Sequence, residues 1–281
     1  MTDVFYGRQA VIATMHGKEK VIAPVLEAGL GIKCEVPANF DTDRYGTFSG
    51  ETERNGSPLN TVRQKCLDAM EKYGVNIGIA SEGSFGPHPS MFFAHANEEI
   101  LMFIDKRNDL EVVVKELSTD TNFNGRLIEQ IDSLIEFANL VHFPSHALIL
   151  KTGPNKLEGM VKGITDRVKL MEDAEEMLNH FGSLYVETDM RAHFNPSRMK
   201  VIAKTAQKLL ETLQKLCPQC NTPGFTVQDV RRGLPCLQCK LPTKSVQTLL
   251  HICKKCSYTQ EQWYPHGKKF EQPDYCDYCN P

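Results

Sequence analysis

Four Cys-x-x-Cys pairs in the last 65 residues constrain the fold of this chain more than any other feature of its sequence. A two-residue spacer lets a tight turn aim both sulfurs at one ion, and two such turns complete a tetrahedral shell of four thiolates. The pairs therefore predict two structural zinc ions, with iron–sulfur ligation and disulfide pairing as the alternatives. The expected ligands are Cys217, Cys220, Cys236, Cys239, Cys253, Cys256, Cys276 and Cys279.

Residues 217–281 resemble a double zinc ribbon, a small and mostly β module. Because 15 residues separate the first two pairs and 19 the last two, we expect neighbouring pairs to share an ion, with an interleaved arrangement as the alternative. Apolar side chains are few here, so bound metal has to supply much of the folding free energy, on the order of 10 kcal/mol per site. Three strand-like segments are expected to form the hairpins that carry the turns: 224–230, 246–252 and 258–264.

The partners of this module are either nucleic acid or protein. Trp263, Tyr264 and Phe270 are available for stacking on bases, and basic residues lie close to them in the sequence. Residues 217–281 hold eight Lys or Arg and five Asp or Glu, but eight thiolates with two zinc ions bring the module near a net charge of -1. A general attraction to nucleic acid is therefore absent, and only a local basic patch can provide one.

Residues 1–216 alternate strand and helix signals, which predicts an α/β domain with a mixed sheet and flanking helices. The sheet is expected to be mixed because residues 90–96 and 99–105 read as a hairpin that turns at Asn97 and Glu98. Ser57, followed by Pro58, is expected to cap a helix. Further helices are expected over 17–28, 125–138 and 166–181, and Ser197 is expected to cap a last helix. Further strands are expected over 8–15, 31–36, 75–80, 110–117, 147–151 and 184–187.

No apolar run approaches the roughly 18–20 residues that span a bilayer, and the first 15 residues lack the pattern of a cleaved signal. We therefore expect a cytoplasmic protein without a membrane partner. Disulfides are rare in the cytosol, which again favours metal binding by the C-terminal cysteines.

Three segments of the first domain can form a phosphate site if the fold brings them together. The first strand ends in Thr14, His16 and Lys18 at the start of a helix, a position that suits an anion. A polar loop carries Glu51 and Glu53. Glu82 follows the third strand, and ligands bind beside the carboxyl ends of strands in open α/β sheets. Carboxylates at such a place suit Mg²⁺, which joins protein oxygens to phosphate oxygens.

The order of the candidate residues along the chain is Ala13-Thr14, the loop glutamates, Asn60 and Glu82-Gly83. In this order, residues 10–105 resemble the inosine triphosphate pyrophosphatase superfamily and its relatives that hydrolyse aberrant purine nucleoside triphosphates. The resemblance implies Mg²⁺-dependent attack of water on a triphosphate. It implies that Glu82 and Glu51 or Glu53 hold the metal, and that Lys18 holds phosphate. The chain departs from the pattern where His16 replaces an Asn and Lys18 stands one place early. The whole architecture is similar to an uncharacterised bacterial family.

A second polar cluster, residues 187–198, precedes the last helix and contains Arg191 and Arg198. Two arginines beside a helix start can hold phosphate or carboxylate, and ordinary turn and cap chemistry is the alternative. If both clusters line one cleft, these arginines complete a polyphosphate site. The sequence thus favours a Mg²⁺-dependent nucleoside triphosphate hydrolase with a zinc-ribbon module. The rival is a noncatalytic protein that binds nucleic acid or protein through the ribbon.

Overall fold

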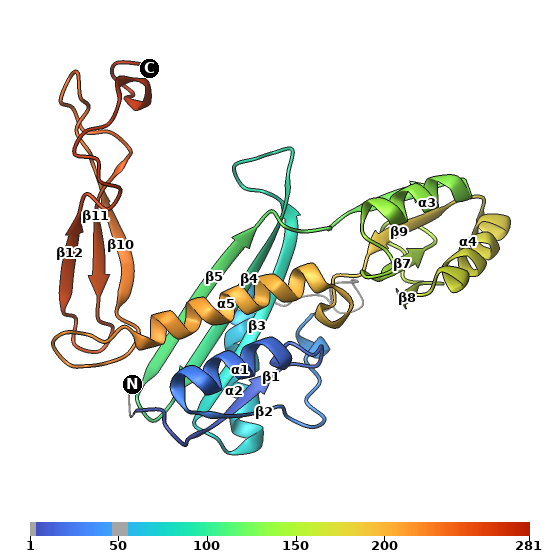
Figure 1. Cartoon of the computed structure of the whole chain (residues 1–281), viewed down its shortest axis with the longest axis horizontal. Helices are drawn as coiled ribbons and strands as arrows, with labels where there is room; N and C mark the ends of the chain where they lie inside the picture. Colours follow the sequence, from blue (N-terminus) through green and yellow to red (C-terminus); the bar gives the residue numbers. More distant parts are fainter. Residues whose placement is uncertain (1–3, 47–55) are drawn as a thin grey trace. The chain divides into compact units, whose positions relative to one another are not determined.

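A computed structural model describes residues 4–46 and 56–281 of the chain, which forms two compact units, Met1–Leu210 (unit 1) and Glu211–Pro281 (unit 2) (Figure 1). Unit 1 is a mixed α/β structure with two sheets, and unit 2 carries a third sheet. No helix in the described ranges is long and apolar enough to cross a membrane.

The first sheet of unit 1 has five strands in the order β2-β1-β3-β4-β5. Strands β2, β1 and β3 are parallel, whereas β3, β4 and β5 are antiparallel, so the expected mixed sheet is confirmed. The strands are β1 (Gln9–Ala13), β2 (Lys33–Glu35), β3 (Ile77–Pro87), β4 (His95–Asp105) and β5 (Leu110–Ser118).

Helices cover both faces of this sheet (Figure 1): α1 (Glu19–Leu30), α2 (Pro58–Tyr73) and α5 (Pro196–Gln214). Helix α2 packs its apolar side, including Cys66 and Met70, against residues such as Ala80 and Met102 on one face. Helices α1 and α5 pack together, since a Cβ on Gly29 would lie 2.3 Å from a methyl carbon of Leu210.

The predicted caps of two helices have different outcomes. Ser57 caps α2 as expected, because its hydroxyl accepts a hydrogen bond from the backbone N–H of Asn60. Helix α5 is capped by Asn195 instead of Ser197, because the Asn195 side chain accepts the backbone N–H of Arg198 at 2.9 Å. Pro196 then takes the first helical position, where its missing N–H costs nothing.

The hairpin expected to turn at Asn97 and Glu98 was wrong, because both residues lie inside β4. Strand β4 instead pairs with β3 along its whole length, and the chain turns over residues 88–94. Ala13, the last residue of β1, pairs with Ala80, so β3 continues for seven residues beyond the end of β1. Two predicted site residues, Lys18 and Glu82, lie at this part of β3, since Lys18 bonds to the hydroxyl of Ser81.

The second sheet of unit 1 is antiparallel, in the order β6-β9-β7-β8, and packs its apolar side chains with helices α3 and α4. The helix expected over 125–138 was wrong in its first part, because residues 125–128 form a strand paired with β9. The elements are β6 (Gly125–Ile128), α3 (Ile131–Leu140), β7 (Leu148–Lys151), β8 (Val161–Ile164), α4 (Arg167–Phe181) and β9 (Leu184–Thr188).

Unit 2 contains a three-stranded antiparallel meander that matches the three predicted strands closely. Its strands are β10 (Thr226–Arg232), β11 (Val246–Ile252) and β12 (Thr259–Trp263). Few side chains are buried in this unit, and its hydrophobic cluster consists of Phe225 and Tyr258 with cysteines around them.

Candidate metal centres and a buried charged cluster

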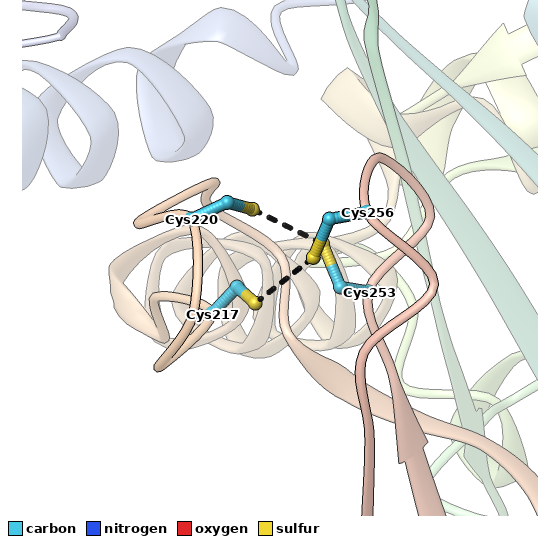
Figure 2. A group of neighbouring side chains, drawn as sticks. All are labelled: Cys217, Cys220, Cys253 and Cys256. Carbon is cyan, nitrogen blue, oxygen red and sulfur yellow. Dashed lines mark hydrogen bonds between the residues drawn. The ribbon is translucent and has the colours of Figure 1, made fainter.

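The eight C-terminal cysteines form two groups of four in which the sulfurs of each group lie within 4.8 Å of one another. In the first group the Sγ atoms of Cys217 and Cys256 are 3.7 Å apart, and Figure 2 shows the four thiols turned toward a common centre. All ten cysteines of the chain are free thiols. Four converging thiols are a ligand set for a metal ion such as zinc. The groups are Cys217, Cys220, Cys253 and Cys256, and Cys236, Cys239, Cys276 and Cys279.

The expected pairing of neighbouring Cys-x-x-Cys turns was wrong, because the first pair joins the third and the second joins the fourth. The meander explains this arrangement. Thr226 at the start of β10 pairs with Ile252 at the end of β11, so the turns before β10 and after β11 meet. Each strand then carries the chain to the other end of the sheet, where the second and fourth pairs meet.

Hydrogen bonding makes the thiols of each group unequal. The Thr222 hydroxyl, 3.1 Å from the Cys220 sulfur, lowers the pKa of that thiol to about 6. The neighbouring Cys239 thiol raises the pKa of Cys279 to about 12. Four adjacent thiolates repel one another, so each group needs a cation to ionise fully.

Unit 1 contains five charged side chains that are each at most 8% exposed and lie together at the part of β3 described above. We call them the charged cluster: Lys18, Lys65, Glu82, Glu99 and Arg198. The turn between β1 and α1, helix α2, strands β3 and β4, and the first turn of α5 each contribute one member. The fold therefore joins Lys18, Glu82 and Arg198, which the sequence analysis had named in three separate segments.

The charged cluster contains two ion pairs and a lysine that bonds to a serine hydroxyl. Lys65 Nζ lies 2.6 Å from Glu82 Oε2, and Arg198 Nε lies 2.7 Å from Glu99 Oε1. Lys18 Nζ donates to the Ser81 hydroxyl at 2.9 Å. Side chains alternate along β3, so Ser81 and Glu82 point to opposite faces of the sheet.

The charged cluster contains three cations and two carboxylates. Burial, followed by repulsion from Arg198, lowers the pKa of Lys18 to about 7. Among the described residues its ammonium bonds to the Ser81 hydroxyl and to no carboxylate, and at neutral pH it holds its proton only part of the time. A bound anion would supply the missing negative charge and stabilise the protonated form.

Other predicted residues lie beside the charged cluster. The His16 ring stacks on His193 with centroids 5.2 Å apart, and His16 Nε2 lies 3.2 Å from an oxygen of Asp43. Burial and the neighbouring His16 ring lower the pKa of His193. Arg191 pairs with Asp189, with a shortest distance of 2.6 Å. The first turn of α1 and the segment before α5 thus meet at the imidazole rings.

The remaining predicted residues are not joined to the charged cluster by a contact that we observe. Asn60 is exposed on the first turn of α2. Glu51 and Glu53 lie outside the described residues. Thr14 is buried beside the ends of β1 and β2, at a cavity of about 540 Å³. This cavity falls in the size range of small-molecule sites, and its lining residues are Thr14, Met15, Gly17, Glu19, Val36, Pro37, Asn39, Phe40 and Asp41.

Sequence reasoning missed Lys65 and Glu99 as members of the site. Glu99 shares its side of β4 with Leu101 and Phe103, which are buried, so a charged residue at this place in the alternation was a usable signal. Lys65 similarly belongs to the buried side of α2 with Val62.

A comparison with protein-family models matches residues 65–281 to the family described as Domain of unknown function (DUF6671). This match covers more than half of the chain, and the chain therefore belongs to that family. A search of curated proteins found no match.

Proposed function

We propose that this member of the DUF6671 family binds the phosphate chain of a nucleoside triphosphate at the charged cluster and hydrolyses it with Mg²⁺. One observation carries the proposal: Lys18 and Arg198 are buried cations beside the face of the sheet that carries Ser81, and Lys18 has no carboxylate partner of its own among the described residues. Buried cations interact strongly with an anion because little water screens them.

The side chains would divide the work of binding and hydrolysis. Lys18 and Arg198 would bind phosphate oxygens from the face of the sheet that carries Ser81. Lys65 holds Glu82 in place through their ion pair. Glu82 is an oxygen donor of the kind Mg²⁺ prefers, and Glu51 or Glu53 is the further carboxylate we assign to the metal. A bound Mg²⁺ would supply charge neutralisation at the phosphate oxygens.

Hydrolysis can be tested by incubating the full chain with a panel of nucleoside triphosphates and Mg²⁺, adding pyrophosphatase, and measuring phosphate. We expect phosphate release that is lost in Glu82→Gln and kept in Glu71→Gln, which alters an exposed carboxylate on the same helix as Lys65. Release that is absent from the wild-type protein, or equal in both variants, would contradict the hydrolase proposal.

We further propose that unit 2 is a double zinc ribbon with one structural zinc ion in each cysteine group. The two convergent sets of four thiols and the small apolar core support this. Metal analysis of protein purified without added metal is expected to find two zinc ions per chain. A ratio of zinc ions to protein chains near zero, or iron in place of zinc, would contradict the zinc-ribbon proposal.

Unit 2 also supports a second function, binding of nucleic acid or protein. Lys240 lies 4.8 Å from the centroid of the Phe270 ring, and Arg231 lies 5.9 Å from that of Trp263. Both rings are partly exposed, as stacking on bases requires. Single-stranded RNA binding that weakens with added salt and is lost in Trp263→Ala would support nucleic acid as the partner.

A further inference from the structure

The connection between β3 and β4 carries two consecutive phenylalanines that face solvent. Phe92 is 90% exposed and Phe93 is 92% exposed, so water surrounds both rings. Two side chains of this size expose roughly 400 Å² of apolar surface, an area that marks an interaction site. We call residues 87–95 the hairpin tip, which Figure 1 shows in teal at the ends of β3 and β4.

The hairpin tip projects from the first sheet. Strands β3 and β4 remain paired as far as Pro87 and His95. The neighbouring strands stop earlier, β1 opposite Ala80 and β5 opposite Asn97. A two-stranded extension of the sheet therefore holds both phenyl rings away from the rest of unit 1.

Backbone N–H groups of the hairpin tip bond within the tip itself. The N–H of His88 donates to the carbonyl of Ala94 at 2.8 Å, and the N–H of Ala94 donates to the carbonyl of Met91 at 3.0 Å. The Nδ1 atom of His88 accepts the N–H groups of Ser90 and Met91, each at 3.1 Å. Pro89 has no N–H to satisfy. The tip can therefore leave water with few unbonded donors, which entry into an apolar medium requires.

The composition and size of the hairpin tip narrow the choice of partner. Residues 83–97 contain no Lys, Arg, Asp or Glu, so the tip has no cation for the phosphates of a nucleic acid. Two copies packed tip to tip would bury four phenyl rings, about 800 Å² in total, which is less than the roughly 1,200 Å² of a specific interface. A fluid lipid phase, in contrast, surrounds a projecting tip and covers both rings on all sides.

We propose that the hairpin tip inserts Phe92 and Phe93 into the interface of a lipid bilayer and so attaches the protein to a membrane surface. Aromatic side chains are favoured at this depth of a bilayer. The expectation of no membrane partner depended on the lack of a spanning segment, which insertion at the interface does not need. The proposal is independent of nucleotide hydrolysis. Burial of one phenyl ring strengthens binding by about 10- to 150-fold.

The test is cosedimentation of the full chain with phosphatidylcholine vesicles at low and high salt. We expect the wild type to bind with an affinity that salt does not weaken, because the hairpin tip has no Lys, Arg, Asp or Glu. Phe92→Ser and Phe93→Ser should each weaken binding by about tenfold or more. Phe181→Ser, which alters an exposed phenylalanine at the end of α4, is the matched control and should leave binding unchanged.

A tryptophan at the hairpin tip reports insertion directly. Phe92→Trp, in a chain with Trp263→Phe, should shift its emission to the blue on vesicles and be quenched by brominated lipid. Both serine variants should unfold in urea at the wild-type midpoint, because the rings they remove are exposed. Absence of vesicle binding would overturn the proposal in favour of a protein pocket as the partner. Binding that is equal in Phe92→Ser and Phe181→Ser, or that needs anionic lipid and is lost at high salt, would also overturn it.

Discussion

Replacing Lys18 with methionine should change the pH dependence of unfolding of unit 1. Burial, followed by repulsion from Arg198, lowers the Lys18 pKa to about 7 in the folded protein, against 10.5 for an ordinary lysine. Between these values the unfolded chain binds more protons than the folded one. The free energy of unfolding of the wild type therefore rises with pH in this window. From pH 7 to pH 9 the contribution of Lys18 amounts to about 2 kcal/mol.

The change in the free energy of unfolding that Lys18→Met causes at pH 7 follows from the burial of Lys18 and its bond to Ser81. Keeping Lys18 buried costs the wild type about 4 kcal/mol at pH 7. Lys18→Met removes this cost but leaves the Ser81 hydroxyl without its bond from Nζ, a loss of about 1–3 kcal/mol. We therefore expect the variant to be more stable than the wild type at pH 7, and the difference to shrink or reverse by pH 9.

The assay is urea unfolding at pH 7, 8 and 9, followed by helical circular dichroism. Helices α1 to α4 and most of α5 belong to unit 1, whereas the chain's single tryptophan, Trp263, belongs to unit 2 and reports on it separately. Lys20→Met, which alters an exposed lysine on the same helix, is the matched control and should show no such pH dependence. A difference between wild type and Lys18→Met that is constant across pH would refute the reasoning.

Three further predictions concern the metal groups and the charged cluster. If the cysteine groups hold metal as proposed, a chelator should change Trp263 fluorescence while the helical signal stays, because each bound ion would supply on the order of 10 kcal/mol to unit 2. An unchanged fluorescence would count against this. Cys220→Ser should increase the reactivity of Cys253 and Cys256 toward a thiol reagent more than that of Cys236 and Cys239. A larger increase at Cys236 and Cys239 would argue that neighbouring Cys-x-x-Cys turns pair. Gly83→Ala should push Arg198 from Glu99 and destabilise unit 1 by about 1–3 kcal/mol in urea unfolding, and a midpoint equal to that of the wild type would show that the pair shifts freely.

Local signals predicted most of the elements but not their partners. The cap at Ser57 and the strand over 110–117 depend on nearby residues, and both are confirmed. Residues 125–128 form a strand because they pair with residues 184–187, about 60 positions away. A four-residue strand has too little periodicity of its own to show this.

The same limit explains the errors at the candidate sites. The Cys-x-x-Cys spacing predicts which residues form each turn, but the direction of β10 and β11 decides which turns meet. Lys18 and Arg198 were identified separately, and only the packing of α1 and α5 on one sheet joins them. Glu99 lay within the expected strand over 99–105, but only the pairing with β3 and the ion pair with Arg198 place its side chain in the site.

The claim that the charged cluster binds a phosphate chain is tested most directly by calorimetric titration with inorganic triphosphate at pH 7, 8 and 9. Above pH 7 the Lys18 amine must take up a proton to bind an anion, so the wild-type affinity should fall by about tenfold per pH unit. Lys18→Met should bind more weakly at pH 7 and show a much smaller pH dependence. Absence of binding, or equal affinities for wild type and variant at every pH, would contradict the account.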